Sequence, residues 1–285
     1  MKLHGIFPSI TTPFDHKGDL YKIKVQHNIE KWNLTALSGY VVCGLTGESV
    51  YLATQEKVSV WEWTAKYAAS EKLLIAGTSA EGVRETVELT NRAAEIGYKA
   101  AMVRPPRYYN ALNCPDAQML YFRAVADQSG IPIVIHNLPE MTIDTVAALS
   151  HHPNIIAVVE SSGDIARLVQ AVKPGFQVLA GSTPVLAESF AAGAVGAVLA
   201  FANAAPYATI SIWEAHRTRE ADAALDWQNR IAPAARLVTA KYGVPGLKYA
   251  MELNGYFGGP PRLPLTVITP EARHEIEQAF DGIKG

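Results

Sequence analysis

Several side chains that can do chemistry stand directly after short apolar runs of the sequence. His136 ends one such run, and an imidazole exchanges protons near neutral pH. Thr46, within the turn-like segment 44–48, carries a hydroxyl that can donate or accept a hydrogen bond. Arg107 carries a guanidinium fork that suits an acidic group, and the phenol of Tyr109 follows two positions later. These residue types suit proton transfer and the binding of an anionic group.

Eight apolar runs, each followed by an amphipathic segment, would have to position these side chains. The runs start about 20 to 35 residues apart, which suits one strand plus one helix per unit. The predicted strands are 6–10, 39–43, 73–77, 100–104, 133–136, 155–160, 177–180 and 196–200. The predicted helices are 22–32, 54–69, 83–96, 115–128, 143–150, 165–172, 184–192, 210–217, 221–238 and 269–283.

This order predicts an α/β protein, a (β/α)8 TIM barrel with additional C-terminal helices. Consecutive apolar residues, as in 155–159, are typical of parallel strands covered on both faces. A doubly wound open sheet is the alternative, but the chain has no GxGxxG or GxxxxGK turn. No linker-like segment divides the sequence, so we expect one domain over 1–285, with the barrel proper in 1–205 and a helical extension in 206–285. In such a barrel, function collects at the ends of the strands.

Composition and charge exclude other classes of protein. A hydrophobic fraction of 49% rules out a disordered chain, and a net charge of −2 argues against a nucleic-acid partner. The N-terminus does not resemble a signal peptide, and the most apolar stretch, 191–202, is shorter than the roughly 20 residues of a membrane span. Cytoplasmic location without membrane association is the expectation. The two cysteines and the scattered histidines show no metal-ligand spacing, so we expect no metal and no cofactor.

Seven ordered segments resemble the dihydrodipicolinate synthase/N-acetylneuraminate lyase family of class I aldolases. They are Gly5…Thr12-Pro13-Phe14, the GxTGE turn 44–48, Tyr108-Tyr109, Asn137-x-Pro139, the segment 160–164, Gly193-Ala-x-Gly196…Asn203, and 262–265. The resemblance implies (β/α)8 subunits in a homo-oligomer, a tetramer or a dimer. It also implies a lyase that holds pyruvate or another 2-oxo acid as a Schiff base on a lysine.

The sequence departs from that family at the lysine. Val159 occupies the position immediately before the acidic-Ser-Ser-Gly turn, and an isopropyl group is no nucleophile. The chain has no lysine between Lys99 and Lys173, which includes the whole region of the fourth to sixth predicted strands. Glu160 is expected to orient neighbouring groups, because alternate residues of a strand face opposite sides. Lys248, in the C-terminal region, is expected to have a structural role.

Other departures affect the proton relay and substrate recognition. His136 replaces the tyrosine of the family's relay; it either moves protons or is a structural histidine. Leu45 replaces the first hydroxyl residue of the GxTGE turn, which leaves Thr46 to hold a carboxylate. Met141 stands where dihydrodipicolinate synthases place an arginine. Tyr109 is retained, and either joins a relay or packs at a subunit interface.

Two functions remain open. In the first, the protein is a lyase for a small 2-oxo or hydroxy acid without a Schiff base: His136 is the acid/base, Tyr109 assists, and Thr46 and Arg107 hold the carboxylate. The other residues expected to line the substrate are Leu45, Val159, Gly181 and Val198. In the second, the chain is a non-catalytic relative that binds a small acid or serves as a partner subunit. Dihydrodipicolinate synthase activity itself is disfavoured, because several of its parts are missing together.

Overall fold

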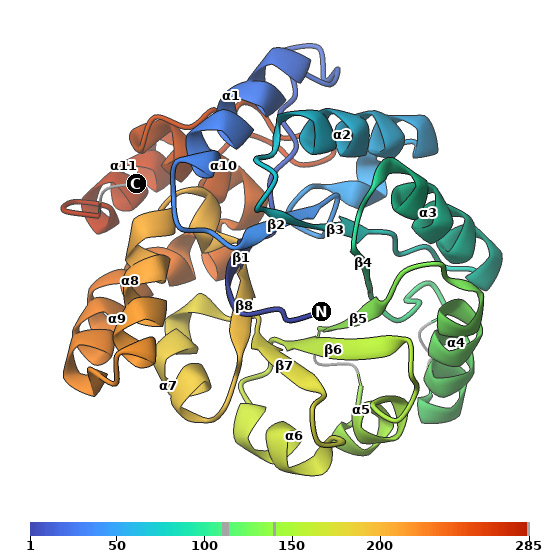
Figure 1. The fold of residues 1–285 in the computed structure, drawn as a ribbon. Helices are drawn as coiled ribbons and strands as arrows, with labels where there is room; N and C mark the ends of the chain where they lie inside the picture. The colour runs from blue at the N-terminus through green and yellow to red at the C-terminus, as the bar shows by residue number, and fades with distance from the viewer. Residues whose placement is uncertain (110–113, 139–140, 284–285) are drawn as a thin grey trace.

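The computed structural model describes residues 1–109, 114–138 and 141–283, and in it eight parallel strands form a barrel (Figure 1). The strands are β1 Gly5–Pro8, β2 Gly39–Val42, β3 Leu73–Gly77, β4 Ala100–Val103, β5 Ile133–Asn137, β6 Ile155–Glu160, β7 Gln177–Ala180 and β8 Gly196–Leu199. From β2 to β8 each strand pairs with the next one in sequence, and β8 pairs with β1. A parallel bridge between Ser9 and Val41 joins β1 to β2 and closes the ring. The predicted fold class is confirmed.

Helices surround the barrel and continue beyond it. They are α1 Lys22–Asn33, α2 Thr54–Tyr67, α3 Val83–Ile96, α4 Pro115–Gln128, α5 Ile143–Leu149, α6 Ile165–Ala171, α7 Leu186–Ala191, α8 Pro206–Arg217, α9 Ala221–Arg236, α10 Gly243–Leu253 and α11 Pro270–Ala279. Short turns are η1 Ser49–Tyr51, η3 Thr183–Val185, η4 Phe201–Asn203 and a π-helical turn, η5 Leu237–Lys241. Helix α8 packs against α7 and β1 and completes the ring of helices. The chain division at residue 205 stays a prediction.

The helix α10 is the main difference from the predicted elements. It begins with Gly243 and contains Pro245 and Gly246, residues that are unfavourable inside a helix. Pro245 is tolerated because it lies in the first turn, where backbone N–H groups have no partner within the helix. A side chain at position 246 would lie 2.5 Å from Cβ of Tyr242, so glycine allows this close approach. Tertiary packing therefore stabilises this helix although its first residues have a low helix propensity.

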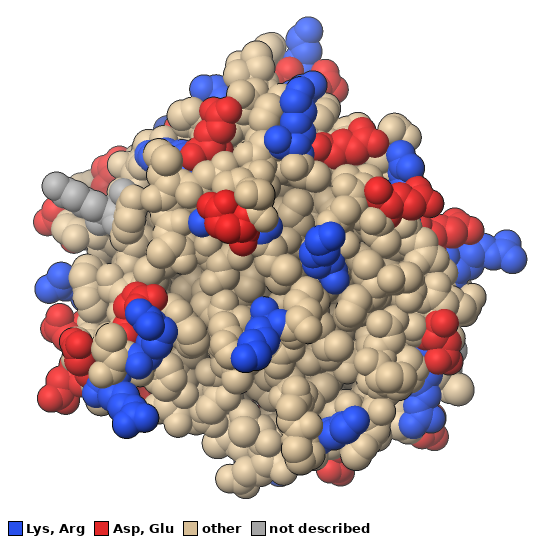
Figure 2. Space-filling model, viewed as in Figure 1, with Lys and Arg blue, Asp and Glu red and all other residues tan. Residues whose placement is uncertain are grey.

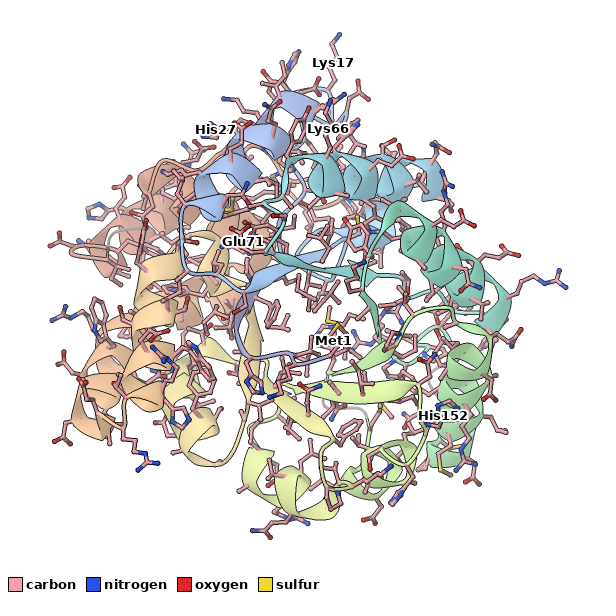
Figure 3. The ribbon with its side chains drawn as sticks, in the orientation of Figure 1. Met1, Lys17, His27, Lys66, Glu71 and His152 are labelled. Atoms are coloured by element: carbon pink, nitrogen blue, oxygen red, sulfur yellow. The ribbon has the colours of Figure 1, made fainter. Side chains whose placement is uncertain are left out.

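The barrel interior is filled by apolar side chains that alternate with outward-facing ones along each strand. The interior cluster consists of Leu3, Phe7, Val41, Ile75, Ala100, Met102, Val134, Ala157, Val159, Leu179 and Val198. The N-terminal residues close the amino end of the barrel, where the backbone N–H of Leu3 donates to the side chain of Gln177 (2.7 Å). In Figure 3, Met1 lies over this end, and Glu71 and His152 mark the loops that precede β3 and β6. The strands therefore end on the opposite side of the barrel.

The surface on the amino side carries charges of both signs. In Figure 2, Lys and Arg side chains are scattered over this face, some of them near its centre, and are interspersed with Asp and Glu toward its rim. A protein that binds nucleic acid usually gathers positive charge on one face, and this face does not show such a patch. Among the described residues, no helix combines the length and the apolar character that a membrane span requires.

Candidate active site

A cavity of about 480 Å³ lies at the carboxyl ends of the strands. Two parts of the chain line it. The loops and strands of the barrel contribute Ser9, Leu45, Thr46, Met102, His136, Leu138, Ser161, Gly181, Ser182, Thr183, Pro184, Val198 and Ala200. The C-terminal extension contributes Val238, Thr239, Ala240, Gly243, Val244 and Leu247. The cavity is in the position where barrel enzymes bind their substrates.

The turn after β2 presents hydrogen-bond donors at this cavity. Its shape is set by two backbone bonds, from Gly47 to Gly44 (3.2 Å) and from Glu48 to Leu45 (3.1 Å). Within the described part of the chain, the backbone N–H groups of Leu45 and Thr46 and the Thr46 hydroxyl have no hydrogen-bond partner. Successive free N–H groups in a turn form a neutral cradle for an anion. This turn can therefore hold a carboxylate without a cationic side chain.

His136 is the titratable side chain of the cavity. It is the second-last residue of β5, is half-buried, and pairs in register with Val159 of β6. Burial lowers the pKa of His136 to about 4, and the positive charges of Arg104 and Arg107 act in the same direction. The imidazole is consequently neutral at pH 7, so it can accept a proton from a bound molecule.

This low pKa predicts a pH-dependent stability. The ordinary pKa of the imidazole is 6.5, so between pH 6.5 and about 4 the unfolded chain binds more protons than the folded chain. The contribution of His136 is complete above pH 6.5 and is lost as the pH falls toward 4. The full loss amounts to about 3 kcal/mol at most, and partial exposure of the ring reduces it.

Urea unfolding at pH 7 and pH 4.5 measures this effect in the wild type and in His136→Gln, which cannot titrate. We expect the wild type to lose more stability than the variant on acidification. Nuclear magnetic resonance of the imidazole protons gives the pKa directly. An equal loss in both proteins, or an imidazole that titrates near pH 6.5, would contradict the assignment.

Val159 lies beneath the cavity and does not line it. Its side chain is 0% exposed and packs inside the barrel beside Leu179, its register partner on β7. Gly181, which lines the cavity, is its neighbour: a Cβ at position 181 would lie 3.1 Å from a methyl group of Val159 and 2.3 Å from Oγ of Ser161. Position 159 is thus separated from the cavity by only one shell of atoms.

The carboxylate of Glu160 faces away from the barrel interior, as predicted from the alternation of side chains. One oxygen accepts from Nδ2 of Asn137 (2.6 Å) and the other from the backbone N–H of Ser162 (2.5 Å). Both oxygens are thereby occupied, and the bonds fix the ends of β5 and β6 relative to each other. This arrangement fits an orienting carboxylate.

Arg107 and Tyr109 lie outside the cavity lining in this chain. Both are exposed on the loop after β4, with Tyr109 72% exposed. Glu81 holds this loop: one carboxylate oxygen accepts from the guanidinium of Arg104 (2.7 Å), and the other from the backbone N–H groups of Arg107 (2.7 Å) and Tyr108 (2.9 Å). Of the eight residues predicted at the site, the structure brings five together at the cavity: Leu45, Thr46, His136, Gly181 and Val198.

The sequence did not reveal that the turn η5 contributes to the cavity. In η5 the backbone N–H of Tyr242 donates to the carbonyl of Leu237 (2.8 Å), a π-helical bond, and such turns are frequent at functional sites. The carboxylate of Glu275 on α11 holds the end of the turn through Lys241 (2.7 Å) and the hydroxyl of Tyr242. These contacts join residues far apart in sequence, so no local pattern signals them.

Across 1–109, 114–138 and 141–283, no three His, Cys, Asp or Glu side chains are grouped so that they could hold a metal ion. The described lining of the cavity offers an imidazole, several hydroxyls and backbone N–H groups.

Comparison with known proteins assigns the family. The model of the dihydrodipicolinate synthetase family matches residues 2–282. The 4-hydroxy-tetrahydrodipicolinate synthase of Methanothrix thermoacetophila is 35% identical over 287 residues, which cover 97% of this chain and 95% of that protein. The dihydrodipicolinate synthase of Aquifex aeolicus superposes with a TM-score of 0.91 at 27% identity, with 98% of each chain covered. The Acinetobacter baumannii enzyme, complexed with pyruvate, gives 0.92 at 25% identity, with 99% of this chain and 100% of that chain covered. The chain thus belongs to the dihydrodipicolinate synthetase family of aldolase-type lyases.

Proposed function

We propose that the protein is a lyase that acts on a small 2-oxo or hydroxy acid in this cavity without a lysine Schiff base. One observation carries the proposal. Among the described residues that line the cavity there is no lysine, and His136 is the titratable group. Val159, the residue at the family's lysine position in the sequence pattern, is an apolar residue buried in the barrel.

The turn after β2 would hold the carboxylate of the substrate. The free N–H groups of Leu45 and Thr46 and the hydroxyl of Thr46 donate hydrogen bonds to its oxygens, and bonds of an ionised acceptor are the stronger kind. A pyruvate complex of the Acinetobacter baumannii relative supports a 2-oxo acid as the ligand class. The acid places one anionic charge in the cavity, which raises the pKa of the nearby imidazole from its low value.

His136 would carry the proton. In a carbon–carbon cleavage, the neutral imidazole accepts the proton of the substrate hydroxyl while the bond breaks. The electron pair of that bond moves to the 2-oxo group, which becomes an enolate, and the imidazolium returns the proton to the enolate carbon. The hydroxyls of Ser161 and Ser182 line the same cavity and can donate to the enolate oxygen.

Arg107 and Tyr109 belong to the proposal through a second copy of the chain. Their exposure on one loop fits residues that act across a subunit interface of a homo-oligomer, a tetramer or a dimer. Tyr108 and Tyr109 form an edge-to-face pair with ring centres 5.1 Å apart, and tyrosines are enriched at interfaces. Arg107 would then help Thr46 to hold the carboxylate, and Tyr109 would assist proton transfer.

The proposal predicts that pyruvate forms no covalent adduct with the protein. A Schiff base is fixed by borohydride reduction, because the reduced carbon–nitrogen bond no longer hydrolyses. After incubation with pyruvate and borohydride, we expect the intact mass of the protein to be unchanged. A family member with the lysine, treated identically, is the positive control. A stoichiometric adduct that maps to one lysine would overturn the proposal.

Turnover separates the lyase from a non-catalytic relative. Acids that raise the melting temperature are tested for cleavage with the wild type and with His136→Gln. We expect turnover by the wild type and a loss of about 10²-fold or more in the variant, the usual contribution of an acid–base group. Ligand binding without turnover of any binding acid would favour the non-catalytic alternative.

A further inference from the structure

Part of the cavity wall is apolar. Side chains from two parts of the chain form it: Leu45, Leu138 and Pro184 from the barrel loops, and Val238, Val244 and Leu247 from the C-terminal extension. Leu45 remains 53% exposed although it lines this cavity. A ligand with an apolar group would remove this surface from water, which is favourable in proportion to the area buried.

The cavity offers no charged side chain to a second anionic group of a ligand. Its described lining contains no Lys, Arg, Asp or Glu. Arg104, whose charge acts on His136, forms a salt bridge with Glu81 (2.7 Å) and donates to the carbonyl of Pro105 (2.8 Å). A carboxylate in the middle of this wall would lose its hydration and gain no cation in return.

Two cations of the C-terminal extension, Lys248 and Arg262, lie near the turn after β2, and both are paired with carboxylates. The Lys248 ammonium lies 2.6 Å from the Glu48 carboxylate, and the guanidinium of Arg262 pairs with Glu56 (2.7 Å). Neither lines the cavity. Among the described residues, the site therefore combines one neutral cradle for a carboxylate with a remainder of apolar side chains, hydroxyls and the neutral His136 imidazole, and without a charged side chain.

We propose that the ligand of this cavity is a 2-oxo or 2-hydroxy monocarboxylic acid with a branched aliphatic or aromatic tail, and that dicarboxylic acids are rejected. The inference rests on the proposed function, because it assumes that the cradle of Leu45 and Thr46 binds the acid head. The volume of about 480 Å³ supports it. It falls within the range of roughly 300–1,000 Å³ that pockets for sizeable ligands occupy, and a three-carbon acid would leave most of it unfilled.

A pair of shape-matched acids tests the proposal. 5-Methyl-2-oxohexanoate and 2-oxopentanedioate share the 2-oxo acid head and the chain, but end in an isopropyl group and in a carboxylate of similar shape. Isothermal titration calorimetry gives their dissociation constants, with pyruvate as the head alone. We expect the isopropyl acid to bind at least tenfold more tightly than the dicarboxylate and than pyruvate.

A cation introduced into the wall should reverse this preference. In Leu138→Arg we expect 2-oxopentanedioate to bind more tightly than in the wild type and the isopropyl acid to bind more weakly. Leu120→Arg is the matched control, because Leu120 is 70% exposed on α4 and outside the cavity, so the added charge should leave both constants unchanged.

The outcomes distinguish this inference from the proposed function. If the wild type bound 2-oxopentanedioate more tightly than the isopropyl acid, the inference would be overturned, but the site would still bind 2-oxo acids. Equal binding of all three acids would do the same, since it would show that the tail contacts no wall. Binding of none of them would overturn the proposed function, and the inference with it.

Discussion

Replacing Lys248 by methionine is expected to lower the free energy of unfolding by about 3–5 kcal/mol, the cost of breaking a buried ion pair. The Lys248 ammonium lies 2.6 Å from the carboxylate of Glu48, and both side chains are 1% exposed. It also donates to the carbonyls of Thr12 (2.9 Å) and Pro260 (3.0 Å). Burial lowers the pKa of Lys248, and the Glu48 carboxylate opposes that shift. Methionine removes the charge and all these bonds while it keeps the volume.

The loss of unfolding free energy in Lys248→Met arises mainly from Glu48, which remains buried without its cation. Glu48 would stay buried with the backbone N–H of Arg262 as a donor (2.8 Å), which does not replace a full positive charge. The double variant Lys248→Met with Glu48→Gln removes both charges, so we expect it to be more stable than the single variant. Glu48 follows Thr46 in the turn at the cavity, so the single variant should also weaken the binding of an acid.

Urea unfolding at pH 7 measures these effects. Lys241→Met is the matched control, because Lys241 pairs with Glu275 at a similar distance (2.7 Å) but is 53% exposed. An exposed ion pair contributes about 0–1 kcal/mol. Equal losses in Lys241→Met and Lys248→Met would contradict the reading that burial makes the inner pair important.

The strands could be predicted from the sequence because each is a short apolar run buried on both faces. Runs 73–77, 155–160 and 177–180 agree with β3, β6 and β7 at both ends. The first strand was predicted at 6–10 but β1 is Gly5–Pro8, since after Pro8 the chain leaves the ladder with β8 and forms single bonds to its neighbours. Ends of elements depend on such contacts, whereas the existence of an element depends on its own composition.

The sequence could predict a residue of the candidate site only where the position of that residue along a strand determines where it lies. His136 lies near the end of β5 and Thr46 in the turn after β2, so the fold alone brings them to the carboxyl end of the barrel. Arg107 and Tyr109 lie further along a loop that Glu81 fixes from another unit, and a sequence pattern does not contain that contact. The contribution of Val244 was missed for the same reason, because packing of the C-terminal extension places it over the barrel.

Val159→Lys is expected to give the protein the covalent chemistry that the wild type lacks. The position is 0% exposed, beside His136 in the ladder and next to Gly181 at the floor of the cavity. A lysine has a flexible four-carbon stem, so its amine can extend past Gly181 into the cavity. Burial disfavours the ammonium and lowers the pKa, which increases the fraction of the nucleophilic free amine near neutral pH.

With pyruvate and borohydride, we expect a stoichiometric adduct that maps to position 159 in Val159→Lys and none in the wild type. Val159→Met is the control, because it has a similar unbranched side chain without an amine and should report only the effect on packing. Circular dichroism and urea unfolding establish that each variant is folded before the reaction is tested. A folded Val159→Lys variant without an adduct would show that position 159 does not reach the cavity. An adduct would mean that the absence of covalent chemistry in this protein comes from one side chain, because the surrounding barrel still accepts a 2-oxo acid.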